Sequence, residues 1–137
     1  MALILDAGVL FAALDRRDKH HASCRGLIDN STELRVIPAM ILPEVDYLIS
    51  ERVGAGPMIG LLRDVDRGVF VIEDLAFEDY RRVWEILDKY ADQDVGLVDA
   101  AVLAIVERFG ERKLATIDHR HFSMLRPRHT ESLELLP

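Results

Sequence analysis

The sequence predicts an α/β domain in which a central, mostly parallel sheet of four to five strands is flanked by helices on both faces. Short aliphatic runs bounded by polar or turn residues alternate with longer segments whose apolar residues recur every three or four positions. Such alternation is typical of parallel sheets covered by helices. No repeat, low-complexity tract or Pro/Gly-rich linker divides the 137 residues, so we expect a single domain over residues 1–137.

Five short segments are predicted to be strands. Four of them are β-branched or aliphatic runs with polar or turn residues on either side, and the fifth lies at the end of the sequence. In order, they are Ala2–Leu5, Leu34–Ile37, Val69–Ile72, Lys113–Ile117 and Leu133–Leu136.

The segments between the strands have helical spacing. Pro43 should kink the third helix or mark a later start, and Gly110 is suited to end the last one. Tyr80 and Trp84 have core-like spacing in the fifth helix and are expected to pack in the interior. The predicted helices are Gly8–Leu14, His20–Ile28, Ala39–Arg52, Pro57–Val65, Phe77–Tyr90 and Leu97–Phe109.

Composition narrows the classes of protein. The net charge of −7 argues against the broad basic surface that phosphate-neutralising proteins usually carry. A single cysteine, Cys24, excludes an internal disulfide and any site built from several thiolates. Asp6 interrupts the apolar N-terminal run and charged residues follow soon after, so we expect neither a signal peptide nor a spanning helix, and a cytoplasmic location.

Four acidic residues end or interrupt apolar segments. Asp6 ends the first strand and Asp118 the fourth, at the sheet edge where ligands of α/β proteins bind. Glu44 and Asp99 lie within otherwise apolar helical runs. Taken singly, each has a structural alternative: Asp6 and Asp118 as helix caps, Glu44 as a solvent-facing group and Asp99 as a first-turn carboxylate.

Taken together, the four acids indicate a metal site. Burying an unpaired carboxylate is strongly unfavourable, and two such charges about 4 Å apart repel by roughly 4 kcal/mol at an effective dielectric near 20. No Lys or Arg adjoins Glu44 or Asp99 within the apolar runs. A hard cation with oxygen ligands, Mg²⁺ or Mn²⁺, is therefore the natural compensating charge, and it could activate a water for attack on a phosphodiester.

Four segments carry a family resemblance that extends over nearly the whole chain. They read ILDAGVLFAALD, IPAMILPEVDYLIS, YADQDVGLVDAAVLAIVERFG and LATIDHRHFSMLRP. The chain resembles PIN-domain ribonucleases, specifically the VapC toxins of bacterial toxin–antitoxin pairs. The resemblance implies a PIN-like three-layer sandwich that holds Mg²⁺ or Mn²⁺. The implied metal-binding and catalytic residues are Asp6, Glu44, Asp99 and Asp118, with Asp92 and Thr116 as auxiliary candidates.

The resemblance also implies a function and partners. The expected activity is that of a metal-dependent endoribonuclease toxin, whose activated water attacks in line and leaves a 5′-phosphate and a 3′-hydroxyl. The implied partners are a cognate antitoxin protein, an RNA substrate (tRNA, rRNA or mRNA) and a second copy of the chain, with no role for a membrane. A PIN-like binding module that is weak or inactive in catalysis stays as the alternative. Its support is the acidic composition and Gly8, which stands where relatives commonly have a hydroxyl residue.

Two rival enzyme classes are disfavoured. Haloacid-dehalogenase-like phosphatases need a second Asp where Gly8 stands, and a receiver domain needs an acidic pair near the first strand.

Phosphates of a nucleic acid could contact either of two groups of basic residues. One comprises Arg16, Arg17, Lys19, His20, His21 and Arg25, and the other Arg112, Lys113, Arg120, Arg126 and Arg128.

Overall fold

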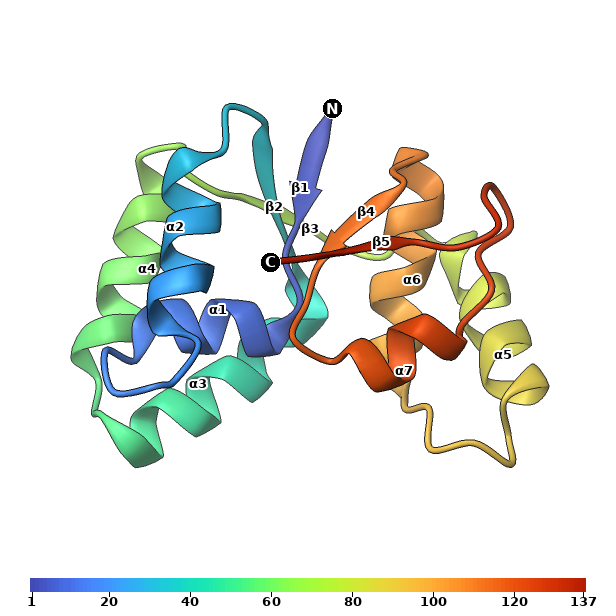
Figure 1. The fold of residues 1–137 in the computed structure, drawn as a ribbon, viewed down its shortest axis with the longest axis horizontal. Helices are drawn as coiled ribbons and strands as arrows, with labels where there is room; N and C mark the ends of the chain where they lie inside the picture. Colours follow the sequence, from blue (N-terminus) through green and yellow to red (C-terminus); the bar gives the residue numbers. More distant parts are fainter.

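The computed structural model describes residues 1–137 as a parallel sheet between two layers of helices (Figure 1). Strands β1, β2 and β3 pair in parallel, β4 and β5 form a second parallel pair, and a bridge between Leu5 and Ala115 joins the two. The sheet order is therefore β3-β2-β1-β4-β5, and the predicted fold class is confirmed. The strands are β1 (Ala2–Ile4), β2 (Leu34–Pro38), β3 (Val71–Glu73), β4 (Lys113–Ala115) and β5 (Glu134–Leu136).

The helices divide between the two faces of the sheet. Figure 1 shows α1 to α4 on one side and α5 to α7 on the other. The bounds are α1 (Ala7–Leu14), α2 (His21–Asn30), α3 (Leu42–Arg52), α4 (Gly56–Asp66), α5 (Asp79–Lys89), α6 (Leu97–Phe109) and α7 (His119–Met124). None of them combines the length and apolar character needed to cross a bilayer.

The core explains why the most apolar segments take central places. Residues 2–5 are all buried because β1 lies between β2 and β4 with helices over both faces. Residues 100–106 of α6 are buried all round as well. A helix that is apolar on every side needs such a central position.

The observed secondary structure departs most clearly from the sequence prediction at α3, β3 and α7. A 3₁₀ turn, η1 (Ala39–Ile41), precedes α3, so the helix starts late, with Pro43 in its first turn where a missing N–H costs nothing. Strand β3 begins at Val71 rather than at Val69. Helix α7 was not predicted, because its sequence HRHFSM is short and largely polar.

The predicted burial of Tyr80 and Trp84 is wrong. Their side chains are 54% and 59% exposed, whereas Val83 and Ile86 carry the buried face of α5. Helical spacing shows that one face is apolar, but here aromatic side chains also line the opposite face.

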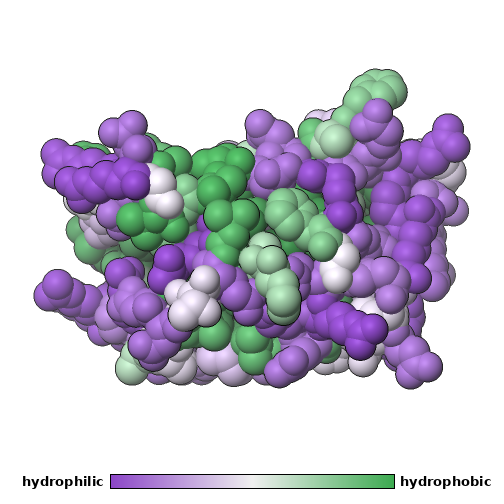
Figure 2. Space-filling view, turned by 90° about the horizontal axis from the view of Figure 1, so that it is seen from above, coloured by the Kyte–Doolittle hydropathy of each residue, from purple (hydrophilic) through white to green (hydrophobic).

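The starts of the strands occupy the face that Figure 2 shows from above. Hydrophobic side chains gather near its middle and hydrophilic ones dominate to either side. Two polar contacts join the starts of the strands here: the Glu111 carboxylate accepts a buried hydrogen bond from the Ala2 N–H at 2.6 Å, and Lys113 forms a partly buried ion pair with Glu33 at 2.9 Å. The predicted site residues Asp6, Asp99 and Asp118 lie at the opposite edge.

Candidate active site at the carboxyl edge of the sheet

Asp6 lies at the end of β1, next to the end of β4. Its N–H donates to the carbonyl of Ala115 at 2.9 Å, and its side chain is only 6% exposed. Although Asp6 occupies the N-cap position of α1, its carboxylate makes no capping hydrogen bond. The Asp6 Oδ2 instead accepts a 2.8 Å hydrogen bond from the Thr116 hydroxyl.

Thr116 links two of the predicted acids. Its hydroxyl donates to Asp6 and accepts a 3.0 Å hydrogen bond from the N–H of Asp118. Thr116 is fully buried, and its own N–H donates to the Leu136 carbonyl of β5 at 2.7 Å. The adjacency of β1 and β4 thus brings Asp6 and Asp118 to one edge, as the positions of these acids at strand ends predicted.

Asp118 caps α7 and hydrogen-bonds to the imidazole of His121. Its Oδ1 accepts from the His121 N–H at 3.1 Å, while its Oδ2 lies 2.7 Å from His121 Nδ1. Burial acts to raise the pKa of Asp118, but the hydrogen bonds and charge of His121 outweigh it and hold that pKa below its usual value. The bond to Asp118 in turn raises the pKa of His121. The buried His121 Nε2 has no hydrogen-bond partner.

Asp6 and Asp99 resist ionisation. Burial raises the pKa of Asp6 to about 6, against the lowering effect of the Thr116 hydrogen bond and with added repulsion from Asp99 and Asp118. Burial also raises the pKa of Asp99, which lies in the first turn of α6, although the charge of His121 opposes the shift. Perturbed acids of this kind cluster at functional sites.

Glu44 and Asp92 are less closely tied to this group. Glu44 lies in the first turn of α3 and is exposed, and Asp92 is exposed in the loop before α6. Neither is among the main causes of the pKa shifts of Asp6, Asp99 and Asp118. The structure therefore brings together three of the four predicted acids, with Thr116 between two of them.

The site residues predicted from the sequence did not include two members of the cluster, Asp94 and His121. The charge of Asp94, two residues after Asp92, acts on both Asp99 and His121. His121 is hydrogen-bonded to Asp118. The spacing of Asp118 and His121, with the acid at an N-cap and the imidazole three residues later, was a usable signal for the second of them.

The chemistry of the cluster suits a hard divalent cation. Asp6, Asp99 and Asp118 provide oxygen donors, the type of ligand that Mg²⁺ and Mn²⁺ prefer. None of the three forms an ion pair with Lys or Arg, and the one ion pair among them joins Asp118 to His121. Among side chains in direct contact, only His121 offsets their mutual repulsion. No three acidic, histidine or cysteine side chains are, however, already close enough together to hold an ion.

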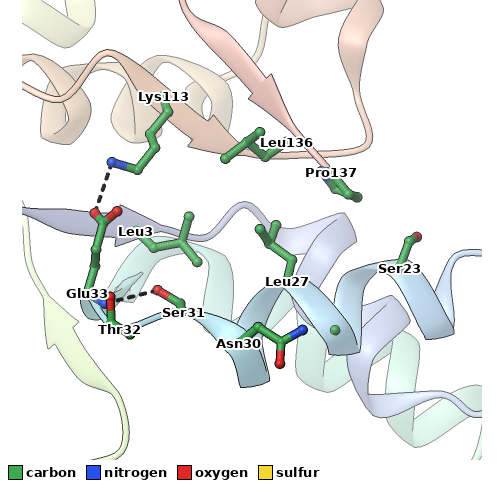
Figure 3. A pocket seen from close by; sticks show the side chains of 11 residues that line it. Leu3, Ser23, Leu27, Asn30, Ser31, Thr32, Glu33, Lys113, Leu136 and Pro137 are labelled. Carbon is green, nitrogen blue, oxygen red and sulfur yellow. Dashed lines mark hydrogen bonds and ion pairs between the residues drawn. The ribbon is translucent and has the colours of Figure 1, made fainter.

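A separate hollow of about 540 Å³ lies between α2 and strands β4 and β5 (Figure 3). Leu3, Leu27 and Leu136 give it apolar walls, and the ion pair of Lys113 with Glu33 stands at one end. None of the four predicted acids lines it.

Comparison with known proteins identifies the class. The model of the PIN domain family matches residues 3–126. The chain therefore belongs to the PIN domain family. It is also 33% identical over 125 residues to ribonuclease VapC26 of Mycobacterium tuberculosis (strain ATCC 25618 / H37Rv), which covers 91% of this chain and 93% of that protein.

Solved structures agree on the fold. VapC20 of Mycobacterium tuberculosis, described as a toxin that cleaves the sarcin-ricin loop, superposes with a TM-score of 0.74 at 18% identity over 82% of this chain and 86% of its own. VapBC2 of Rickettsia felis, bound to a DNA fragment from its promoter, matches with a TM-score of 0.71 at 16% identity over 100% of both chains. At these identities the likeness concerns the fold alone.

Proposed function

We propose that this protein is a metal-dependent endoribonuclease that acts as the toxin of a toxin–antitoxin pair. The observation that carries the proposal is the group of Asp6, Asp99 and Asp118, three mutually repelling carboxylates at the carboxyl edge of a PIN sheet, without a Lys or Arg ion-paired to them. The 33% identity to a ribonuclease over most of both chains supports RNA as the substrate.

Asp6, Asp99 and Asp118 would hold Mg²⁺ or Mn²⁺, and Glu44 would join them from α3. A bound ion of this kind lowers the pKa of a water molecule. It also stabilises the negative charge on the phosphate that this water attacks. Because Glu44 is exposed in the first turn of its helix, its side chain is free to change rotamer toward the other acids.

The chain's own groups have distinct roles in this scheme. Thr116 fixes the carboxylate of Asp6 and the main chain of Asp118. The carboxylate of Asp118 orients His121 through Nδ1, which leaves the buried Nε2 as an unused polar atom of the imidazole. His121 therefore serves to position Asp118 and to reduce the negative charge of the cluster.

The test is cleavage of a labelled single-stranded RNA by the purified chain, with Mg²⁺ or Mn²⁺ and then with EDTA. We expect cleavage with the ion, loss of it in EDTA, and 5′-phosphate and 3′-hydroxyl ends. Asp99→Asn should lower the rate by at least about a hundredfold while the melting temperature stays at or above that of the wild type. Asp88→Asn, which changes an exposed acid on α5, is the matched control.

Two outcomes would contradict this proposal. Cleavage that persists in EDTA would exclude the metal. RNA binding without cleavage under any ion would favour the alternative function, a PIN-like binding module.

The proposed partners follow from the same assignment. VapBC2 of Rickettsia felis and VapBC of Salmonella typhimurium are solved as complexes bound to DNA, and we propose a cognate antitoxin protein for this chain as well. A homodimer and a cytoplasmic location, where the RNA substrates are, belong to the same proposal. Co-expression with the protein encoded by the neighbouring gene, followed by size-exclusion chromatography with light scattering, tests both assemblies.

A further inference from the structure

Half of the arginines of this acidic chain bind other groups of the protein through their side chains. Arg82 and Arg108 form ion pairs with carboxylates, as do three further arginines, and Arg35 donates to main-chain carbonyls. The three further pairs are Arg25 with Asp29, Arg67 with Asp64 and Arg128 with Glu85. By contrast, no carboxylate lies within 4 Å of the guanidinium groups of Arg16, Arg17 and Arg52.

These three free arginines line one hollow. It measures about 460 Å³ and lies where α1 and α3 end and α4 begins. In Figure 1 this place is the lower left of the molecule, where the loop after α1 approaches the turn between α3 and α4. The arginines come from two separate segments, since Arg16 and Arg17 follow α1 and Arg52 ends α3.

The local contacts leave the guanidinium groups available. Arg52 is placed over the ring of Phe11, with its Cζ 5.3 Å from the ring centroid, which restrains the side chain without using its N–H donors. Asp15 is the one acid in the lining. Its side chain is buried, its Oδ1 accepts a 3.0 Å hydrogen bond from the main-chain N–H of Arg17, and it forms no ion pair with an arginine.

Two helices connect this hollow to the acidic cluster. Helix α1 starts directly after Asp6 and α3 carries Glu44 in its first turn, and both run from the carboxyl edge of the sheet toward the hollow (Figure 1). The eight residues of α1 span about 12 Å at 1.5 Å per residue. The arginines and the acids therefore lie at opposite ends of one face.

We propose that Arg16, Arg17 and Arg52 form a phosphate-binding subsite for the RNA strand whose scissile bond lies at the acids. The inference rests on the proposed ribonuclease function and adds the means by which a chain of net charge −7 holds a polyanion. Guanidinium groups donate two parallel hydrogen bonds to one phosphate, which suits arginine better than lysine for this role. Because the arginines and the acids lie at opposite ends of one face, a nucleic-acid strand could contact both groups. An acidic peptide would need only the arginines, so the arrangement favours a nucleic-acid strand.

The experiment measures binding of a fluorescein-labelled single-stranded RNA of twelve nucleotides as a function of NaCl. The protein is the full chain carrying Asp99→Asn, in EDTA, so that the strand stays intact. The logarithm of the association constant falls linearly with the logarithm of the salt concentration. Each of Arg16→Gln, Arg17→Gln and Arg52→Gln should make this slope shallower by about 0.7, and the triple variant by about two. Arg81→Gln removes another unpaired arginine, on α5 across the sheet, and should leave the slope unchanged.

Kinetics on the active chain provides a second measurement. Each substitution should raise KM about tenfold at 0.1 M salt and leave kcat unchanged, because a phosphate contact remote from the reacting bond contributes equally to substrate and transition state. Arg52→Lys keeps the charge and should fall between the wild type and Arg52→Gln. Melting temperatures establish that the variants are folded.

The results separate the two proposals. Cleavage by the wild type together with an unchanged salt slope in the triple variant overturns the subsite alone. A wild type that neither binds nor cleaves RNA overturns the ribonuclease assignment and the subsite with it. If the triple variant keeps its affinity for RNA but loses affinity for a polyglutamate peptide, the hollow is a docking site for an acidic protein segment, and the subsite proposal is wrong.

Discussion

The hydroxyl of Thr116 donates a 2.8 Å hydrogen bond to the carboxylate of Asp6, a residue 110 positions earlier in the chain. Both groups are buried, and the same hydroxyl accepts from the N–H of Asp118. One side chain thus sets the position of a carboxylate on β1 and of the main chain after β4.

Replacing Thr116 by Val removes this donor while keeping the shape of the side chain. The pKa of Asp6 should rise further above its usual range, because the hydrogen bond is the main influence that lowers it. We expect a loss of about 1–2 kcal/mol in the free energy of unfolding. Carbon-13 carboxylate titration and urea unfolding measure the two effects, and Thr116→Ser should restore both. A Val variant that titrates like the wild type would show that the bond does not control Asp6.

Asp6 should make the metal-free protein less stable at neutral pH than in mild acid. Its pKa is about 6 in the folded protein against 3.8 in the unfolded chain, so the folded state binds the proton more tightly. The free energy of unfolding therefore falls as pH rises through this window, by about 3 kcal/mol in total.

Asp6→Asn removes this dependence. In EDTA at pH 7.5, urea unfolding should show the variant more stable than the wild type by about 3 kcal/mol, with the difference shrinking toward pH 4. The pKa of His121 is raised above 6.5, so this residue titrates at higher pH than Asp6. Both proteins contain His121, so its titration does not contribute to the difference between them. Asp88→Asn should leave the curve unchanged, and equal stabilities of Asp6→Asn and wild type at pH 7.5 would contradict the shifted pKa.

Asp94 rather than Asp92 should influence the electrostatics of the site. The charge of Asp94 helps to raise the pKa values of Asp99 and His121. Asp94→Asn should therefore lower both pKa values, and Asp92→Asn should change neither. Nuclear magnetic resonance titration of the metal-free variants measures this directly. The reverse result would restore Asp92 as the auxiliary acid.

Gly8 allows Ile117 to pack against the start of α1. A Cβ added at Gly8 would lie 2.8 Å from Ile117 Cγ1 and 3.1 Å from its Cδ1. Gly8→Ser should destabilise the protein by about 1–3 kcal/mol through overpacking. In an Ile117→Ala background the same change should cost much less, and a double-mutant cycle of melting curves measures the coupling. Additive effects would show that the space is not shared.

The sequence was sufficient to predict the sheet and much of the acidic site, since both follow from local signals. Apolar runs bounded by polar residues marked every strand to within about two residues, as in β1 and β4. Strand ends then placed Asp6 and Asp118 at one edge. Their convergence depends on β1 lying beside β4, and the sequence could predict that only through the family resemblance.

Other features depended on tertiary contacts without a local signal. The exposure of Trp84 depends on which face of α5 meets the core. The proximity of Asp94 to His121 depends on how the loop before α6 lies relative to α7. The joining of Arg52 to Arg16 and Arg17 depends on where two helices end in space, and these residues are 35 or more positions apart in the sequence.

The geometry of the candidate site depends on strand β5. The N–H of Thr116 is held by the carbonyl of Leu136, so this edge strand fixes the backbone that presents the hydroxyl to Asp6. Deletions that remove Leu136 would therefore take away the acceptor that holds Thr116 and act on the candidate site, although Leu136 comes 18 residues after Asp118 in the sequence.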